Sequence, residues 1–123
     1  MSEEKWQFEQ DGLIINASRA NGKGTVAWRG VSDSRTPGAF LSPVLKDITE
    51  KLKGAEVTVD LSKLEYMNSA TVSPLVNFVK TLDGICKRIL LLYSEADWQR
   101  THLQCMRAIA TTLHNVMVQS RRA

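Results

Sequence analysis

Residues 57–72 have the sequence VTVDLSKLEYMNSATV, in which the spacing of apolar residues changes from that of a strand to that of a helix. The segment Glu56–Leu61 alternates apolar with polar residues, which predicts a β-strand. A helix is expected to begin near Ser69, because the side-chain oxygens of Asn68 and Ser69 can accept hydrogen bonds from the first amides of a helix. The intervening residues Ser62–Met67 are interpreted as a short return. The stretch therefore predicts a strand that leads into a helix, as in α/β domains.

The residues before this stretch have the pattern of an antiparallel meander. Short apolar runs are separated by the hairpin dipeptide Asp11-Gly12 and by a second glycine-containing turn at Asn21–Gly24. The runs predict strands around Trp6 and Phe8, at Leu13–Ile15 and at Thr25–Val31. Three short antiparallel strands are therefore expected at the start of the chain.

A first helix is expected between this meander and residue 57. Thr36-Pro37 is typical of a helix start and Gly54 of a helix end, and apolar residues recur at helical spacing between them. Pro43 leaves two alternatives, because proline interrupts a helix interior: the helix begins at Ser42-Pro43, or it bends there.

After Ser69 the pattern predicts a helix, a strand and a further helix. The apolar face of the first of these helices is expected to contain Val72, Leu75, Val76, Val79 and Leu82. Arg88–Tyr93 is a continuous apolar strand, as expected when both faces of a sheet are covered. The last helix is predicted from about Glu95 to Leu113, with an apolar stripe made of Leu103, Met106, Ile109, Ala110, Leu113 and Met117.

The order of elements predicts a single α/β domain that spans residues 1–123. Strands that are linked by helices become parallel neighbours with right-handed connections. We therefore expect a mixed β-sheet with N-terminal antiparallel strands, followed by alternating helices and strands, with the helices packed on the sheet.

Composition and charge restrict the function classes. No apolar run approaches the roughly 20 residues that span a bilayer, and the acidic start at Glu3 and Glu4 does not resemble a secretory signal. A cytoplasmic protein without membrane insertion is therefore expected. The net charge is only +3, and the arginines of the C-terminal part are spread without interleaved aromatic residues, so no nucleic-acid partner is predicted. Cys86 and Cys105 are interpreted as two buried, reduced thiols.

The common catalytic motifs are missing from the sequence. It contains no glycine-rich phosphate loop, no GxSxG motif and no HExxH motif, and no nucleophile is paired with a base. We therefore expect a protein that is not an enzyme and that uses no cofactor or metal. Asn68 and Ser69 have an ordinary structural interpretation as helix caps, but a phosphate on a hydroxyl at this position would lie beside free amides and the positive end of the helix dipole.

The stretch 57–72 resembles the signature of STAS domains, the family of sulphate transporters and anti-sigma factor antagonists. Asp60, Leu61 and Ser62 match the opening of the family pattern, Tyr66 and Met67 match its hydrophobic pair, and Ser69 matches its first hydroxyl. Three positions depart from the pattern. Asn68 replaces the usual Asp, Ala70 occupies the position that the best-known bacterial antagonists phosphorylate, and Thr71 replaces a glycine.

The resemblance implies a partner-switching signalling protein. Such a domain binds a cognate Ser/Thr kinase or anti-sigma factor, which is a histidine-kinase-like ATPase, until its hydroxyl is phosphorylated, and a phosphatase resets it. Here it implies Ser69 as the phosphoacceptor, with Thr71 as the substitute. The partner-binding residues that it implies are Lys63, Glu65, Met67, Asn68, Ser69 and Thr71. Asp60 and Ser62 are expected to have a structural role.

Two other functions remain open at this stage. Because Ala70 stands where the usual acceptor belongs, the chain could be a constitutive STAS-like subunit of a membrane transport complex that is not phosphorylated. A small-molecule or nucleotide-binding domain that uses the helix N-terminus as an anion site is the other alternative. A homodimer is also left open.

Overall fold

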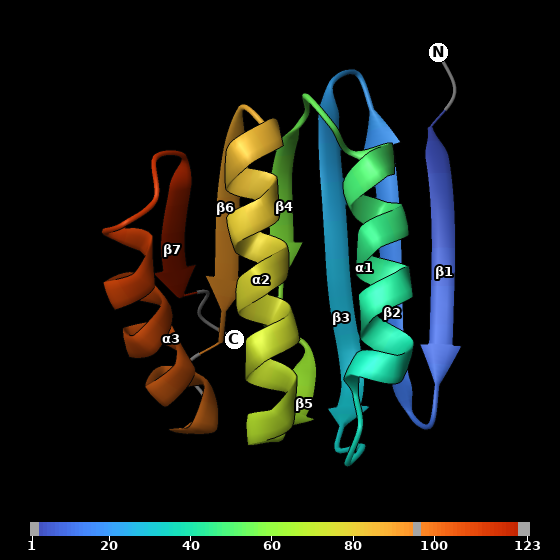
Figure 1. Cartoon of the computed structure of the whole chain (residues 1–123), viewed down its shortest axis with the longest axis vertical. Coiled ribbons are helices and arrows are strands. Elements are labelled where there is room, and N and C mark those ends of the chain that lie inside the picture. The colour runs from blue at the N-terminus through green and yellow to red at the C-terminus, as the bar shows by residue number, and fades with distance from the viewer. Residues whose placement is uncertain (1–2, 95–96, 121–123) are drawn as a thin grey trace.

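The computed structural model describes residues 3–94 and 97–120. In this part of the chain seven strands form one mixed sheet, and three helices lie on one of its faces (Figure 1). The strands are β1 (Glu4–Gln10), β2 (Leu13–Ala20), β3 (Lys23–Ser32), β4 (Glu56–Asp60), β5 (Leu64–Met67), β6 (Arg88–Tyr93) and β7 (Val116–Ser120). The helices are α1 (Gly38–Lys51), α2 (Ser69–Ile85) and α3 (Asp97–Ala110). The predicted fold class is confirmed.

The antiparallel meander forms as expected. β1 pairs with β2, and β2 pairs with β3, both antiparallel. Asp11 and Gly12 have φ values of 51° and 88°, so this hairpin has the two left-handed turn residues that match the twist of the flanking strands. The second turn is shorter than predicted, because it consists of Asn21 and Gly22 alone and β3 begins at Lys23.

The second half of the sheet is parallel. The spatial order is β1-β2-β3-β4-β6-β7, and each helical connection joins parallel neighbours, as predicted. β5 was expected to be part of a short return, and this interpretation is wrong. β4 pairs with the first half of β3, and β5 pairs with its last residues, Gly30–Ser32. Both strands therefore run along the same side of β3.

The end of the chain also differs from the prediction. α3 ends at Ala110 instead of Leu113, and Met117 lies on the added strand β7. After the helix ends, the hydroxyl groups of Thr111 and Thr112 donate to the carbonyls of Ala108 and Ile109 in its last turn. The carboxylate of Asp83 on α2 then accepts the amides of His114 and Asn115. The predicted helix start at Glu95 lies outside the described residues.

α1 begins at Gly38, with the proline Pro43 inside it at an exposed position. The alternative start at Ser42 is therefore wrong. Gly54, predicted as the end signal, follows the helix with a φ of 80°. The amide of Gly54 donates to the carbonyl of Ile85, which joins the end of α1 to the end of α2.

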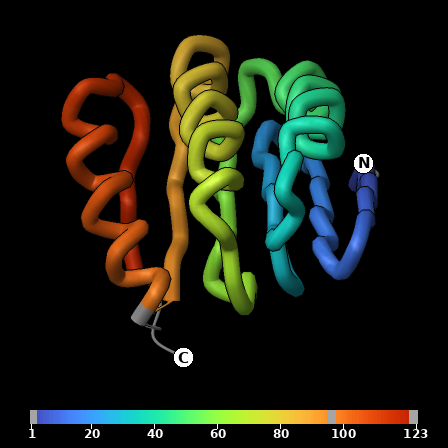
Figure 2. The backbone as a smooth tube through the Cα atoms, turned by 60° about the horizontal axis from the view of Figure 1, so that its bottom comes forward, coloured from blue at the N-terminus to red at the C-terminus, as the bar shows by residue number. Residues whose placement is uncertain are grey.

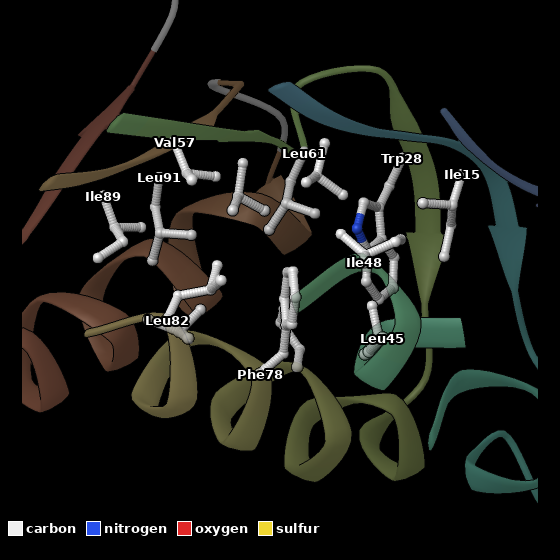
Figure 3. Close-up of a cluster of buried hydrophobic side chains, with 14 of the residues drawn as sticks. Ile15, Trp28, Leu45, Ile48, Val57, Leu61, Phe78, Leu82, Ile89 and Leu91 are labelled. Atoms are coloured by element: carbon white, nitrogen blue, oxygen red, sulfur yellow. The ribbon is translucent and has the colours of Figure 1, made fainter. Parts of the chain in front are cut away.

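The core lies between the sheet and its helices. The largest fully buried side chains include Trp28 and Ile15 from the meander and Leu91 from β6, and these pack against side chains of α1 and α2 such as Ile48 and Leu82 (Figure 3). The helices lie on the same side of the sheet in a second view (Figure 2). β6 therefore has one covered face, since Ile89, Leu91 and Tyr93 are buried while Leu90 and Leu92 are half-buried. The prediction that both faces of this strand are covered is wrong.

The buried face of α2 is rotated from the predicted one. It consists of Thr71, Leu75, Phe78, Val79 and Leu82. Val72 and Val76 were expected on this face and are only partly buried. The rotation places a threonine hydroxyl in the protein interior at the first turn of the helix.

The two cysteines lie in different environments. Cys86 is buried, as predicted, its Sγ donates to the carbonyl of Leu52 over 3.3 Å, and burial raises the pKa of its thiol. Cys105 is exposed on α3, so the prediction of a second buried thiol is wrong.

Candidate functional site

The candidate site is the N-terminus of α2, at the carboxyl edge of the parallel strands. Three segments meet there: the end of β3 at Ser32, the loop 33–36 that leads to α1, and the junction from β5 to α2 at Asn68. In Figure 1 the starts of α1 and α2 lie at the same end of the sheet. The start of α2 was predicted from Asn68 and Ser69, whereas no residue around position 68 indicated that β3 and the loop after it contribute to the site.

A chain of side-chain hydrogen bonds holds the start of α2 to β3. Thr71 is completely buried, and its Oγ1 donates to Asn68 Oδ1 over 2.7 Å. The Oγ atom of Ser32, which is also buried, lies 2.7 Å from Thr71 Oγ1. A threonine hydroxyl has a single hydrogen to donate, so Ser32 must donate to Thr71 in this arrangement. The two hydroxyls are therefore both satisfied, and their directions are fixed by Asn68.

Asn68 connects this chain to the neighbouring loop. Its Oδ1 also accepts the amide of Thr71 over 3.1 Å, which is the usual N-cap contact, and its Nδ2 donates to the carbonyl of Ser34 over 2.8 Å. Its own amide donates to the carbonyl of Ser32. One side chain thus caps α2 and ties the loop 33–36 to it.

The return between β4 and β5 places Tyr66, Met67 and Asn68 at the sheet edge. Asp60 Oδ1 accepts both the amide and the hydroxyl of Ser62, over 2.9 and 2.6 Å. This side-chain turn ends β4 and redirects the chain. The geometry agrees with the structural role that was expected for Asp60 and Ser62.

The side chain of Gln99 on α3 forms hydrogen bonds with the same return. Its side chain is 1% exposed, and its Nε2 donates to the carbonyls of Leu61 and Leu64 over 3.0 and 2.9 Å. Its Oε1 accepts the amide of Ser94 over 2.6 Å. A buried glutamine that satisfies three backbone groups would be costly to replace. The role of Gln99 was not predicted, because a glutamine on a helix is usually exposed.

The predicted site residues fall into an exposed and a buried group. Exposed or half-exposed residues at this edge are Lys63, Glu65, Tyr66, Asn68, Ser69 and Ala70. Met67 and Thr71 are buried, at 3% and 0% exposure. Direct partner contact by Met67 is therefore not compatible with this structure, since its side chain packs into the core. Tyr66 is 47% exposed and was not predicted as a contact residue.

Ser69 is the first residue of α2 and is exposed. It lies at the point where a helix has amides without intrahelical partners and where the helix dipole favours negative charge. Thr71 is two residues away, and its hydroxyl is enclosed. The two hydroxyls that the resemblance offered as phosphoacceptors therefore differ in their access to another protein.

The cavity next to this site is small. It is lined by residues of the loop 33–37, of the β1–β2 turn and of the start of α1, among them Asp11, Ser34 and Phe40, and has a volume of about 70 Å³. Ligand pockets usually have volumes of roughly 300–1,000 Å³. This cavity gives no support to the alternative of a nucleotide-binding domain.

Residues 3–94 and 97–120 contain neither a cluster of metal ligands nor a membrane-spanning helix. In that part of the chain no three His, Cys, Asp or Glu side chains come together as metal ligands. None of its helices combines the length and apolar character needed to cross a membrane. Arg121 and Arg122, which belong to the basic C-terminal part of the sequence, lie outside the described residues.

No protein-family model matches this chain, and no curated protein sequence matches it either.

Proposed function

We propose that this chain is a STAS-like partner-switching module of a bacterial signalling pathway, comparable to an anti-sigma factor antagonist, and that phosphorylation of Ser69 switches its binding. The observation that carries the proposal is the exposed hydroxyl of Ser69 at the start of a helix whose position is fixed by buried hydrogen bonds.

The choice of Ser69 over Thr71 rests on access. A kinase must bring the hydroxyl to its own active site, and Thr71 Oγ1 is enclosed between Asn68 and Ser32. Its phosphorylation would require the first turn of α2 to open. Ser69 needs no such rearrangement, so it is the acceptor in this proposal, and Thr71 takes the role of a positioning residue.

Phosphorylation at this position would change a docking surface. A phosphate brings about −1.5 to −2 charges and three strong acceptor oxygens. Lys63 and Glu65, which carry opposite charges, and Tyr66 are exposed on the return and on β5, the segment that leads to Ser69. A partner that packs on the uncharged helix start would lose its contacts, because a desolvated phosphate without a counter-charge is costly.

The partners of this module would be a cognate Ser/Thr kinase or anti-sigma factor of the histidine-kinase-like ATPase type and a phosphatase. In this proposal the module is cytoplasmic, has no catalytic activity and no cofactor, and does not bind nucleic acid. The kinase supplies ATP, and the chain supplies the hydroxyl. Asn68, Lys63 and Glu65 would surround the contact, and Tyr66 would join them.

Affinity capture with three variants tests this function. Ser69→Ala, Ser69→Asp and, as a matched control, Thr101→Asp are used as baits in extracts of the source cells. Thr101 is an exposed hydroxyl residue on a different helix, α3, so Thr101→Asp controls for the added charge itself. We expect a kinase-like partner on Ser69→Ala and Thr101→Asp but not on Ser69→Asp. Equal capture by all three baits would contradict the proposal.

A constitutive STAS-like subunit of a membrane transport complex is the second candidate. The observation that favours it is Ala70, which is exposed and carries no hydroxyl at the family's usual acceptor position. This function predicts a stable complex with transporter components that survives phosphatase treatment. Dissociation or strengthening of the complex after phosphatase treatment would favour the switch instead.

A further inference from the structure

The strand β1 forms one edge of the sheet, and its outward backbone groups can be identified. The two-residue turn Asp11-Gly12 is closed by the pair Gln10 and Leu13, which is therefore a hydrogen-bonded pair. Hydrogen-bonded pairs alternate along an antiparallel ladder. The backbone groups of Lys5, Gln7 and Glu9 consequently point away from β2, toward the open edge.

The sequence of β1 is self-complementary about Gln7. In an antiparallel pair of two β1 strands with Gln7 opposite Gln7, Lys5 lies opposite Glu9 and Trp6 lies opposite Phe8. This register also places the outward backbone groups of all three residues Lys5, Gln7 and Glu9 opposite one another, so a regular ladder can form. Opposite charges and aromatic pairs that face each other across strands stabilise a sheet.

The aromatic residues of this edge are only partly covered in the single chain. Trp6 and Phe8 pair with the buried residues Ala17 and Ile15, so they lie on the helix side of the sheet. Both remain half-buried, because α1 lies over β2 and β3 rather than over β1 (Figure 1). Lys51 Nζ lies 5.4 Å from the centre of the Trp6 ring. A second copy would bring two further aromatic rings beside this pair.

We propose that two copies of this chain associate through β1, antiparallel and about a twofold axis at Gln7, to form one continuous sheet. The twofold axis is perpendicular to the sheet, so the helices of both copies lie on the same face. The interface is isologous and closes at two subunits. It lies at the opposite edge from β7 and some strands away from α2, so the candidate site stays accessible.

The other edge of the sheet lacks this complementarity. β7 has the sequence VMVQS, which carries no charged residue that could fix a register with a second copy. Pairing of β1 with β7 of another copy would be heterologous and would produce open chains instead of dimers. The charge pattern therefore favours pairing of β1 with β1 of a second copy over pairing of β1 with β7.

Charge reversal on β1 tests the register directly. Lys5→Glu and Glu9→Lys each place two pairs of like charges across the twofold axis, and the combination Lys5→Glu/Glu9→Lys restores two attractive pairs. Lys5 also lies 3.2 Å from the exposed Glu3, but such a surface pair contributes little to folding. By sedimentation equilibrium over a dilution series, we expect each single reversal to weaken the wild-type dimer about tenfold and the double variant to recover it.

Gln7→Pro gives an independent test. It removes the outward amide at the centre of the proposed ladder but no hydrogen bond to β2, so the domain is expected to fold and to be monomeric. Met117→Lys on β7, where Met117 is exposed, is the control and is expected to stay dimeric. A wild-type chain that is monomeric at all concentrations, a dimer that is unaffected by the β1 variants, or a series of larger species would each overturn the proposal.

Discussion

The starts of α1 and α2 lie at the same end of the sheet, beside the same loop, and are built differently. α2 starts after Asn68, whose extended backbone (φ −79°, ψ 168°) and side-chain oxygen cap the helix. α1 starts after Pro37, which has a helical backbone (φ −63°, ψ −24°) and no side-chain cap. Amides of the first turn of α1 donate to backbone carbonyls, as from the Ala39 amide to the Thr36 carbonyl.

This difference between the two helix starts indicates that the surface at the start of α2 is held in a defined shape. At α2, the buried hydroxyls of Ser32 and Thr71 and the partly exposed side chain of Asn68 specify one arrangement, and a hydrogen-bond network whose members are satisfied rigidifies its surroundings. At α1 the chain enters the helix without such contacts. The exposed hydroxyl of Ser69 is therefore presented by a rigid helix start, as a docking surface requires.

Among these variants, Thr71→Val is expected to lower the free energy of unfolding most. The substitution removes the hydroxyl that satisfies both Ser32 Oγ and Asn68 Oδ1, and a buried group without a partner costs about 1–3 kcal/mol. Urea denaturation measures this loss. The matched change at the α1 start, Thr36→Val, affects an exposed side chain and should alter stability by less than about 0.5 kcal/mol. Equal effects of the two changes would remove the distinction between the two helix starts.

Asn68→Ala should have the next largest effect, about 1 kcal/mol, because it removes the N-cap of α2. Asn68→Asp separates the two roles of this residue. Aspartate keeps the acceptor for Thr71 but has no donor for the Ser34 carbonyl. We expect Asn68→Asp to keep the stability of the wild type while the amides of residues 33–36 exchange hydrogen faster. Unchanged exchange in this loop would show that Asn68 does not hold it.

Ser69→Ala should have the smallest effect on stability, within about 0.5 kcal/mol, because the Ser69 side chain is exposed at the first helical position. Thermal unfolding of the Ser69→Ala variant measures this change in stability. A near-zero value matters for the proposed function, since any change in partner binding can then be assigned to the surface. A loss comparable to that of Thr71→Val would instead indicate a structural role for Ser69.

Local sequence signals predicted the elements that local contacts specify. The dipeptide Asp11-Gly12 predicted a hairpin, since few residues other than glycine adopt its φ of 88°. Asn68 and Ser69 predicted a helix start near Ser69, where α2 begins. Both features depend on residues that are adjacent in the chain.

The missed elements depend on distant contacts. β5 buries Leu64 and Met67, three residues apart, so it lacks the alternation by which a strand is recognised. β7 was missed because Leu113 and Met117 continue the helical spacing, while the turn before β7 is made by Asp83 of α2. The burial of Thr71 depends on Ser32, which lies 39 residues earlier in the sequence. No pattern around residue 71 could reveal that contact.

Mapping of phosphate on the chain isolated from its source cells tests the central claim most directly. The account assigns the switch to the exposed Ser69 and a positioning role to the buried Thr71. It predicts that mass spectrometry finds phosphate on Ser69 and none on Thr71, and that the modified fraction falls after phosphatase treatment. Phosphate on Thr71, or a chain without phosphate at either residue while its kinase is active, would contradict it.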